Sequence, residues 1–464
     1  MPSQSTTAVD AFTPHASLAA LGAKLRDLDL FDPIRQHVCI AQKTVKDAPV
    51  DKLFDAFVAI LAGAHGLVEI ETRLRCDQVL QRAFGRARCA EQSVVQATLN
   101  AATAQTVAQM RFAFETILRQ HARAYRHRFD RELLIVDIDL TGLVCGKGCE
   151  GASKGYFADV PKGKAYRTYG RQLARATAAQ YNEILVDLLY PGNVVLETVL
   201  REVVRALESA LVLTEAKRAR TLLRIDGGGG ALETDNWLLE RGYHLLVRDT
   251  SSERAARLSE TVSRWYPDVR HPHREVGWVE EAPDAYVRPV RRLASRWTDR
   301  KKQWRFGVLI TTLLPHQARQ IAGPAPKQLA GVRVELDAVA HAYDLRAGAI
   351  EIENKQDKSG LGIRKRQKKR MAGAQLVVAL NALAHNALVW IRRWLARLAP
   401  ELARLGWLRL VRDLLAISGR VAVSGTGRIS SVWLNGRSPR ARLLAAALEA
   451  LYKRDGIRMR VSAE

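Results

Sequence analysis

The stretch TLLRIDGGGGALETDNWLLERGYHLLVRD, Thr221–Asp249, sets out a strand, a glycine turn, a helix and a second strand. Its first six residues form a short apolar run that ends on the carboxylate of Asp226, and four consecutive glycines follow. Ala231–Gly242 has helical spacing of apolar residues, and YHLLVRD is again a short apolar run. Alternation of strand and helix is typical of an α/β sheet. Asp226 is therefore predicted to lie at the end of a buried strand.

The residues before this stretch continue the pattern. Glu132–Val144, ELLIVDIDLTGLV, is rich in β-branched and apolar residues with polar residues in alternation, which predicts a strand. Ala165–Val194 predicts further strands closed by a Pro-Gly turn, and Asn193–Arg220 predicts an amphipathic helix with a basic end. The predicted fold class for this part of the chain is α/β.

Changes in composition predict five parts. Residues 1–128 are predicted to be helical, either as a helix-turn-helix-like DNA-binding module or as a plain helical bundle. Between residues 250 and 335 prolines, tryptophans and arginines are dense, which predicts a β-rich insertion. The α/β part spans residues 129–249 and resumes at 336–400, and a small C-terminal region, 401–464, carries a hairpin and a final helix.

Charge and composition narrow the class of partner. The 464 residues include 72 lysines and arginines against 48 acids, a net charge of +24, and 47% hydrophobic residues. A folded chain with this excess of positive charge indicates a polyanionic partner, with nucleic acid as the first choice. Five cysteines, an odd and sparse number, argue against a disulfide framework and for a reducing compartment. Met371–Ile391 has no formal charge but holds several polar residues, which predicts a buried helix rather than a membrane span.

Three carboxylates stand out at the ends of predicted elements. Asp139 lies on the first strand, Asp226 at the glycine turn, and Glu351 just before or within the helix that follows the insertion. Each acid alone is more often a turn, cap or solvated residue. Gathered together, however, carboxylates repel one another unless divalent cations lie between them. Two ions about 3.5–4 Å apart can activate a water and stabilise the leaving oxygen in phosphoryl transfer, and oxygen ligands favour Mg²⁺ or Mn²⁺.

Three motifs carry a resemblance to a known family: DIDLTG (Asp137–Gly142), RIDGGGG (Arg224–Gly230) and YDLRAGAIEIENKQDK (Tyr343–Lys358). With them the chain resembles the DDE-type insertion-sequence transposases of the cut-and-paste group that carries a Tyr-Arg-Glu-Lys signature. The resemblance covers roughly residues 130–395, and the downstream QLVVALNALAHNALVW is also similar to the helix that follows the signature in that group.

The resemblance implies a fold, a reaction and a site. The fold is a ribonuclease H-like catalytic core interrupted by a β-rich insertion. The reaction is metal-dependent cleavage at transposon ends and joining of the 3′-hydroxyl ends to target DNA. The implied catalytic metal ligands, for two Mg²⁺ or Mn²⁺ ions, are Asp139, Asp226 and Glu351. The implied contacts to phosphates near the cleaved end are Tyr343, Arg346 and Lys358.

The signature departs from the family pattern at one place. Two residues separate Tyr343 from Arg346 and six separate Glu351 from Lys358, as the family has them. Four residues separate Arg346 from Glu351, where the family has three. Choosing the glutamate at position 353 instead would place a glycine where the lysine belongs, so Lys358 selects Glu351. Helix positions seven apart share a face, so Glu351 and Lys358 are both predicted to face one DNA end.

Two alternatives near the acids stay open. Asp137 and Asp139 lie two apart and face the same side of a strand. The family's Asp-x-Thr pattern favours Asp139 as the ligand, with Asp137 behind it or in a salt bridge. The glycines after Asp226 either leave room for metal-bound phosphate and a sharp exit into the next helix, or are structural turn residues. A nucleotide-binding loop is excluded, because neither Gly-Lys-Ser/Thr nor Gly-x-Gly-x-x-Gly is present there.

Basic and aromatic residues add predicted DNA contacts. Arg364, Lys365 and Arg366 open the run RKRQKKR, which is predicted to follow a DNA backbone and is otherwise a solvated helix start. Trp297 and Trp304 alternate with basic residues in SRWTDRKKQWRF, which suits stacking on an unpaired base or, equally, the core of a small domain.

The predicted partners follow from the family. They are double-stranded DNA, as transposon ends and target, and a second copy of the chain in a homodimer assembled on that DNA, with no membrane. The predicted location is the bacterial cytoplasm, at the nucleoid. The alternatives to a transposase are a metal-dependent nuclease of the same fold and a catalytically silent DNA-binding protein derived from a transposase.

Overall fold

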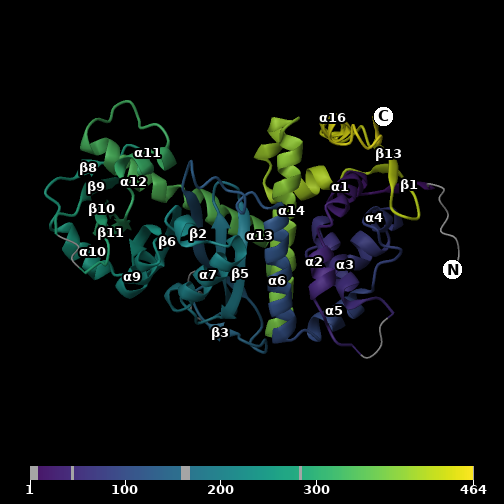
Figure 1. Cartoon of the computed structure of the whole chain (residues 1–464), viewed down its shortest axis with the longest axis horizontal. Coiled ribbons are helices and arrows are strands. Elements are labelled where there is room, and N and C mark those ends of the chain that lie inside the picture. The colour runs from purple at the N-terminus through teal and green to yellow at the C-terminus, as the bar shows by residue number, and fades with distance from the viewer. Residues whose placement is uncertain (1–8, 43–45, 158–167, 282–284, 463–464) are drawn as a thin grey trace. The chain divides into compact units, whose positions relative to one another are not determined.

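The structure is a computed structural model, and it describes residues 9–42, 46–157, 168–281 and 285–462. The chain divides into two compact units. Unit 1 consists of Met1–His121, Leu143–Ala152 and Asn354–Glu464, and unit 2 consists of Ala122–Gly142 and Ser153–Glu353. Both units mix helices and strands (Figure 1), so the predicted α/β class is confirmed at this coarse level.

Unit 2 is built on one mixed sheet. Among the described residues its strands follow the order β3-β4-β2-β6-β7-β11-β10-β9-β8, and β5 also pairs with β4. β2 is parallel to β6 and β6 is parallel to β7, whereas β4 and β5 are antiparallel. The strands are β2 (Leu134–Val144), β3 (Ser153–Lys154), β4 (Tyr169–Ala178), β5 (Glu183–Pro191), β6 (Thr221–Gly230), β7 (His244–Asp249), β8 (Tyr266–Pro267), β9 (Arg274–Trp278), β10 (Arg291–Thr298) and β11 (Trp304–Thr311).

The helices of unit 2 correct one prediction. They are α7 (Leu196–Leu211), α8 (Glu215–Arg218), α9 (Leu232–Glu240), α10 (Ser252–Ser259), α11 (Pro315–Ala322) and α12 (Val332–Asp344), and α13 (Ile352–Ser359) begins in this unit. The single helix predicted over residues 193–220 is wrong, because Val212 has a φ of 50° and ends α7 in the left-handed conformation. Thr214 then starts α8 by accepting a hydrogen bond from the Lys217 amide. The start of the strand predicted from Ala165, residues 165–167, lies outside the described residues.

The alternation of β2 divides its side chains between two cores. Leu134, Val136 and Ile138 pack in the core that contains α7 and α9. Leu133 and Ile135 pack in the core that contains α12. Because side chains of a strand alternate with a period of two, Asp137 and Asp139 face the α12 side. The same count along β6 and β7 places Arg224 and Arg248 on that side.

The segment predicted as a β-rich insertion continues the sheet of unit 2. β11 pairs antiparallel with β7, β10 with β11, and β9 with β10. The segment 250–335 is rich in strands, as predicted. It is not a separate body, however, since it belongs to the same compact unit as the strands before it.

Unit 1 is mainly helical and ends in a small sheet. Its helices are α1 (Ala16–Asp27), α2 (Asp32–His37), α3 (Pro49–Leu61), α4 (Gln78–Ala83), α5 (Gln92–Asn100), α6 (Ala104–His121), α14 (Met371–Ala396), α15 (Trp407–Arg409) and α16 (Ala441–Leu451). Its strands are β1 (Val9–Thr13), β12 (Gly419–Val423), β13 (Ile429–Leu434) and β14 (Arg458–Val461), in the order β1-β12-β13-β14. The predicted C-terminal hairpin and final helix are confirmed as β12–β13 and α16.

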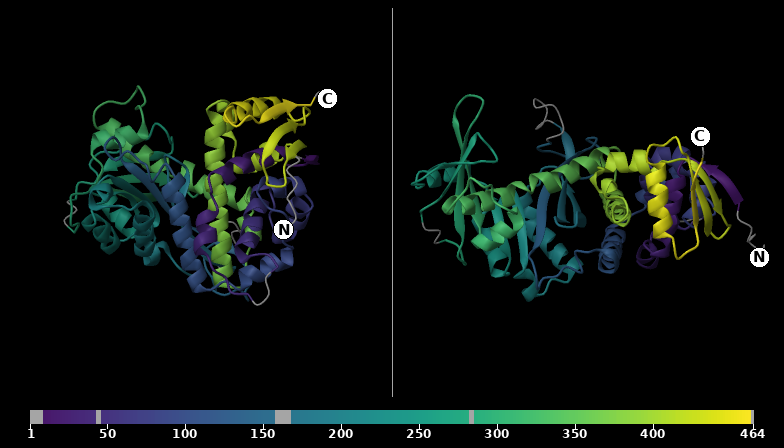
Figure 2. Two further views of the ribbon diagram at one scale, coloured as in Figure 1. Left: turned by 45° about the vertical axis from the view of Figure 1, so that its right-hand side comes forward. Right: turned by 90° about the horizontal axis from the view of Figure 1, so that it is seen from above.

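The first strand of unit 1 corrects the prediction of an all-helical N-terminal region. β1 pairs antiparallel with β12, with Val9 opposite Val423. Figure 2 shows this purple strand beside the yellow strands from the other end of the chain. A pairing between segments so far apart in sequence leaves no local signal, because each strand is short and its partner is distant.

Helix α14 is the long apolar segment of unit 1. By length and composition it could cross a membrane, but 89% of its most apolar window is buried inside the structure. It is visible as the long yellow-green helix in Figure 2. Its interior position is that of a core helix, as predicted.

Candidate active site

Asp226 lies where β6 leaves its regular pairing with β7. The register shifts between Ile225 and Gly230, so that Asp226–Gly229 oppose the single residue Arg248. A bulge of this kind bends the strand and redirects its side chains. Asp226 therefore lies just beyond the last regularly paired residue of a central parallel strand, Ile225. In open α/β sheets, ligand-binding groups lie at this end of the parallel strands.

The four glycines serve two different purposes. A Cβ on Gly230 would lie 2.2 Å from the carbonyl oxygen of Arg248, and one on Gly229 would lie 2.8 Å from a methyl carbon of Ile225. These two glycines are structural, since the neighbouring chain leaves no space for a side chain. A Cβ on Gly228 would keep 3.7 Å from its nearest neighbour, so packing does not require glycine there. Room beside Asp226 is therefore provided by Gly227 and Gly228.

Arg346 contacts two of the three predicted acids, and Tyr343 contacts the third. Its guanidinium Nη2 donates to Asp139 Oδ1 at 2.8 Å and to the carbonyl oxygen of Ile138 at 3.1 Å. Its Nη1 lies 3.6 Å from Glu351 Oε1. Asp226 Oδ1 accepts hydrogen bonds from the Tyr343 hydroxyl at 3.0 Å and from the amide of Gly227 at 2.7 Å. The signature residues Tyr343 and Arg346 thus contact the acids themselves in this structure.

A π-helical turn accounts for the extra residue in the signature. Ala347–Glu351 forms a π-helix between α12 and α13. In an α-helix residues three or four apart are neighbours, whereas a π-turn makes residues five apart neighbours. The family spacing places arginine and glutamate four apart, and here they are five apart. The wider turn therefore restores the ion pair of Arg346 with Glu351 that the added residue would otherwise break.

The charges of the site act on one another. Burial alone would raise the pKa of Asp226, but the charge of Arg346 and the bonds from Gly227 and Tyr343 lower it below its ordinary value. The pKa of Glu351 is raised by burial and by the charges of Asp139 and Asp226, although Arg346 opposes this. The pKa of the Tyr343 hydroxyl is raised by burial and by Asp226. The three carboxylates are therefore within electrostatic reach of one another.

Asp137 has a different role from Asp139. Its carboxylate is fully buried and accepts two hydrogen bonds from Arg224, at 2.6 and 2.7 Å. Arg224 also donates to the carbonyl oxygen of Ala342 on α12. Asp137 is thus one partner of a salt bridge that ties β2, β6 and α12 together, which is one of the two roles left open for it.

The donor set has the chemistry of a magnesium or manganese site but not its geometry. Carboxylate oxygens are the ligands these ions prefer. Within the ranges that the structure describes, however, no group of three or more acid, histidine or cysteine side chains is close enough to hold a metal ion. Arg346 occupies the space between Asp139 and Glu351 instead. In this conformation the residues do not fit a metal ion.

Arg248 is a site residue that the sequence reasoning missed. It is the residue opposite the bulge, and its guanidinium lies over the ring of Trp297 at 5.8 Å. Together with Tyr343 and Asp344 these two side chains line a cavity of about 240 Å³. Strand alternation in YHLLVRD was the available signal, because it places Arg248 on the α12 face.

The two predicted tryptophans do not share a surface. In the antiparallel pair β10–β11, Trp297 is opposite Arg305 and Trp304 is opposite Thr298. Neighbouring residues on a strand face opposite sides, so Trp297 and Trp304 point to opposite faces. Trp297 lines the cavity beside Tyr343, whereas Trp304 is half exposed and lies under Arg296.

The basic run splits into outward and inward residues. Arg364 and Lys365 are exposed. Arg366 is 4% exposed, and its guanidinium donates to the carbonyl oxygens of Leu361 and Ala64. Burial lowers the pKa of Arg366 to about 9. The predicted DNA contact of Arg366 is therefore wrong. This arginine is buried and bonds to backbone carbonyl groups, so its guanidinium is not available to a phosphate. Lys358, half-buried on α13 in unit 1, remains a predicted DNA contact.

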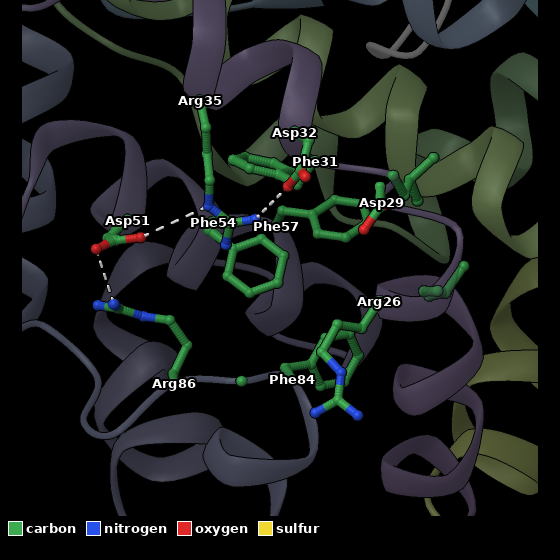
Figure 3. A pocket seen from close by; sticks show the side chains of 13 residues that line it. Arg26, Asp29, Phe31, Asp32, Arg35, Asp51, Phe54, Phe57, Phe84 and Arg86 are labelled. Carbon is green, nitrogen blue, oxygen red and sulfur yellow. Dashed lines mark hydrogen bonds and ion pairs between the residues drawn. The ribbon is translucent and has the colours of Figure 1, made fainter. Parts of the chain in front are cut away.

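Unit 1 contains a second hollow, here called the phenylalanine–arginine pocket. It has a volume of about 380 Å³ and is lined by residues that include Arg26, Phe31, Arg35, Asp51, Phe54, Phe57, Phe84 and Arg86. Figure 3 shows Arg35 and Arg86 reaching Asp51 from opposite sides. Arg86 also makes two bonds to the buried Asp55, at 2.9 and 3.2 Å.

Comparisons with known proteins add little to this site. By sequence the chain matches no family profile and no curated protein. By structure it is similar to a piggyBac transposase solved by cryo-EM in a synaptic complex with hairpin DNA. The TM-score is 0.44 at 11% identity, and the match covers 96% of this chain and 84% of that chain.

Proposed function

We propose that the chain is a DNA transposase that binds transposon ends, cleaves the phosphodiester there and joins the 3′-hydroxyl ends to target DNA. Asp139, Asp226 and Glu351 are its catalytic carboxylates. Two Mg²⁺ or Mn²⁺ ions and a homodimer assembled on DNA belong to this proposal, as does a location in the bacterial cytoplasm at the nucleoid.

The observation that carries the proposal is the convergence of three acids on one segment, Tyr343–Glu351. Asp139 and Glu351 both contact the buried Arg346, and Asp226 is joined to the same segment through Tyr343. These residues come from β2, β6 and the π-turn, which are far apart in sequence. A fold that gathers three carboxylates at one place sets their charges against one another, and sites of this kind are typically functional.

The sheet supports a ribonuclease H-like core. The order β5-β4-β2-β6-β7 combines an antiparallel pair, β4–β5, with the parallel strands β2, β6 and β7. Asp139 and Asp226 each follow directly on the paired part of the two central strands, which runs from Leu134 opposite Thr221 to Ile138 opposite Ile225.

The surroundings of the site suit a DNA end. Arg248 and Tyr343 lie beside Asp226 and supply a cation and a hydroxyl for phosphate oxygens. Trp297 offers a ring in the same cavity for an unpaired base. The net charge of +24 supplies general attraction for DNA. Arg364, Lys365 and Lys358 are further contacts in this proposal.

The test uses the full chain and labelled duplexes taken from the DNA that flanks its gene on both sides. Each duplex is incubated with Mg²⁺ or with EDTA, with the unmodified chain and with Asp226→Asn. The expected result is cleavage at one position, which needs the metal and is lost in the variant. Transfer of the cut end to a second labelled DNA distinguishes a transposase from a nuclease. Tight binding of the duplexes without cleavage in Mg²⁺ would contradict the proposal and favour a silent DNA-binding protein.

A further inference from the structure

The small sheet of unit 1 has one buried face and one face open to solvent. On the buried face Val421 of β12 and Val432 of β13 are fully buried. Helix α1 packs against β12 and β13, and α16 packs against β14. Because the side chains of a strand alternate between its two faces, Arg420 and Trp433, next to these valines, point away from the core. The face onto which they point is here called the outer face.

A row of four residues crosses the outer face. Phe12 lies opposite Arg420 in the pairing of β1 with β12. Trp433 lies opposite Arg420 in the pairing of β12 with β13, and opposite Arg460 in the pairing of β13 with β14. Neighbouring strands lie about 4.8 Å apart, so the row spans roughly 14 Å. Aromatic rings and arginines alternate along it, and the two strands that carry the rings, β1 and β13, are labelled in Figure 1.

The rings and the cations of this face are accessible. Phe12 is 65% exposed, and Trp433 is half-buried, with Cζ of Arg460 4.8 Å from the centre of its ring. Within the ranges that the structure describes, the side chain of Arg460 has no hydrogen bond or ion pair, and the same holds for the exposed Arg458. An arginine that only stacks on a ring keeps its N–H groups for phosphate oxygens.

The position of Phe12 is fixed by its strand. All of Val9–Thr13 is paired with β12. The next residue, Thr13, is buried and its hydroxyl donates to Asp77 Oδ2 at 2.6 Å. The backbone therefore presents the Phe12 ring to solvent at a defined place. Rigid aromatic side chains lose little conformational entropy on binding, so a ring held in this way suits a binding surface.

The charges of the outer face favour an anion. Arg420, Arg458 and Arg460 lie on it, and Asp10 is the one acid in the four strands. Asp10 pairs with Arg420 at 3.3 Å, but both side chains are at least half exposed, which makes the pair weak. In a duplex the faces of the bases are stacked on one another and cannot use an exposed ring. An unpaired strand can use the rings and the arginines together.

We propose that the outer face of this sheet binds single-stranded nucleic acid. Phe12 and Trp433 stack on unpaired bases, and Arg458 and Arg460 contact the phosphates. Four-stranded sheets with aromatic residues on an open face stack two or three bases in this way. The surface belongs to unit 1, whereas Asp139, Asp226 and Glu351 belong to unit 2. The inference therefore does not rest on the proposed function.

The test measures the affinity of the full chain by fluorescence anisotropy. The probes are labelled oligothymidylate and oligouridylate of about 12 nucleotides and a labelled DNA duplex of the same length. The proteins are the unmodified chain, Phe12→Ala, Trp433→Ala, Trp433→Tyr and Leu398→Ala. Leu398 is 50% exposed in unit 1, outside the sheet, so the last variant is the control for loss of an exposed apolar side chain. Circular dichroism and thermal melting establish that each variant folds.

The expected result is that Phe12→Ala weakens the binding of single strands about five- to tenfold, the usual loss for one stacked base. Its affinity for the duplex is expected to stay within about twofold, and since no charge is removed, a change in general attraction cannot explain the loss. Trp433→Tyr keeps a ring and should retain most of the affinity lost in Trp433→Ala. Leu398→Ala should bind as the unmodified chain does. The strand that loses more affinity, DNA or RNA, identifies the natural ligand.

Two outcomes of the binding assay overturn the inference. One is an unchanged affinity for both single strands in folded Phe12→Ala and Trp433→Ala, the result expected if a protein covers this face. The other is an equal loss for single strands and duplex, which would make the face a duplex-binding surface. A second measurement needs no variant: oligonucleotides that carry 5-bromouracil are crosslinked to the unmodified chain by ultraviolet light. Crosslinks are expected in the peptides that hold Phe12 or Trp433, and crosslinks confined to other peptides overturn the inference.

Discussion

Two clusters of arginines and acids in this chain, one in each unit, differ in how the charges are matched. In the phenylalanine–arginine pocket of unit 1 (Figure 3), Arg86 contacts Asp51 and Arg35 pairs with Asp32. Arg86 also has two bonds to Asp55, a buried acid that does not line the pocket. In unit 2 Arg346 contacts Asp139 and Glu351, and Asp226 accepts hydrogen bonds from Tyr343 and Gly227. Matched pairs hold a fold together, whereas several carboxylates gathered at one place can accept a cation from outside. The difference separates structural acids from candidate catalytic ones.

The largest expected effect on DNA cleavage comes from neutralising an acid of the cluster in unit 2. Asp226→Asn removes a charge from the group that acts as a unit, so cleavage of flanking DNA is expected to fall by at least about a thousandfold. Asp51→Asn changes an acid of the pocket in unit 1 and is expected to leave the cleavage rate within about twofold. Single-turnover cleavage assays measure both. Equal losses of cleavage rate in the two variants would erase the distinction between the two clusters.

Breaking a matched pair should instead cost stability. Arg86→Ala leaves the fully buried carboxylate of Asp55 without its arginine, which is expected to cost about 3–5 kcal/mol. Arg35→Ala removes an arginine whose pair with Asp32 is largely exposed, and the expected cost is below about 1 kcal/mol. Urea unfolding followed by circular dichroism compares the two. A larger loss of unfolding free energy in Arg35→Ala than in Arg86→Ala would contradict this expectation.

Asp235 provides a third case, an acid with no cation bonded to it. Both carboxylate oxygens are buried without a hydrogen-bond partner in the described part of the chain, and burial, together with the charge of Asp249, raises the pKa of Asp235 to about 7. Because the folded-state pKa lies above the unfolded value, the folded state loses stability as pH rises from about 4 through about 7. Asp235→Asn should remove this loss and gain about 1–2 kcal/mol at pH 8 relative to pH 5. Melting curves between pH 5 and pH 8 test whether Asp235→Asn removes the loss of stability at high pH. The same dependence of melting temperature on pH in the variant and the unmodified chain would contradict this expectation.

The smallest expected effect concerns the basic run. Replacing both Arg364 and Lys365 by alanine should weaken DNA binding a few-fold and lower the slope of log affinity against log salt by up to about two, one per lost phosphate contact. Arg366→Ala should leave the salt slope unchanged and lower the melting temperature, since Arg366 bonds to backbone carbonyls. Fluorescence anisotropy at several salt concentrations makes the comparison. An altered slope in Arg366→Ala alone would mean that this arginine reaches the DNA.

Local patterns predicted much of unit 2. The strand Glu132–Val144, the strand before the glycines and the helix after them were all readable from periodicity, because these elements are buried on one or both faces. The same alternation explains why Asp139 lies on the α12 side of the sheet. The separation of Trp297 and Trp304 onto opposite faces was also available, since an antiparallel hairpin fixes it.

Other features had no local signal. The pairings of β7 with β11 and of β1 with β12 join segments that are distant in sequence. A short strand carries no sequence pattern that identifies the strand with which it pairs. The π-turn follows from one added residue, which the Arg346–Glu351 spacing flagged without showing how the backbone absorbs it. The burial of Arg366 depends on carbonyl groups of Leu361 and Ala64, and nothing in a basic run tells which arginine turns inward.

The most direct test of the account is an anomalous diffraction measurement at the manganese edge on crystals of the chain with Mn²⁺ and a duplex from its flanking DNA. Anomalous peaks bounded by Asp139, Asp226 and Glu351 are the result expected from the proposed function. Peaks elsewhere, or no peaks while DNA is bound at the site, would contradict it.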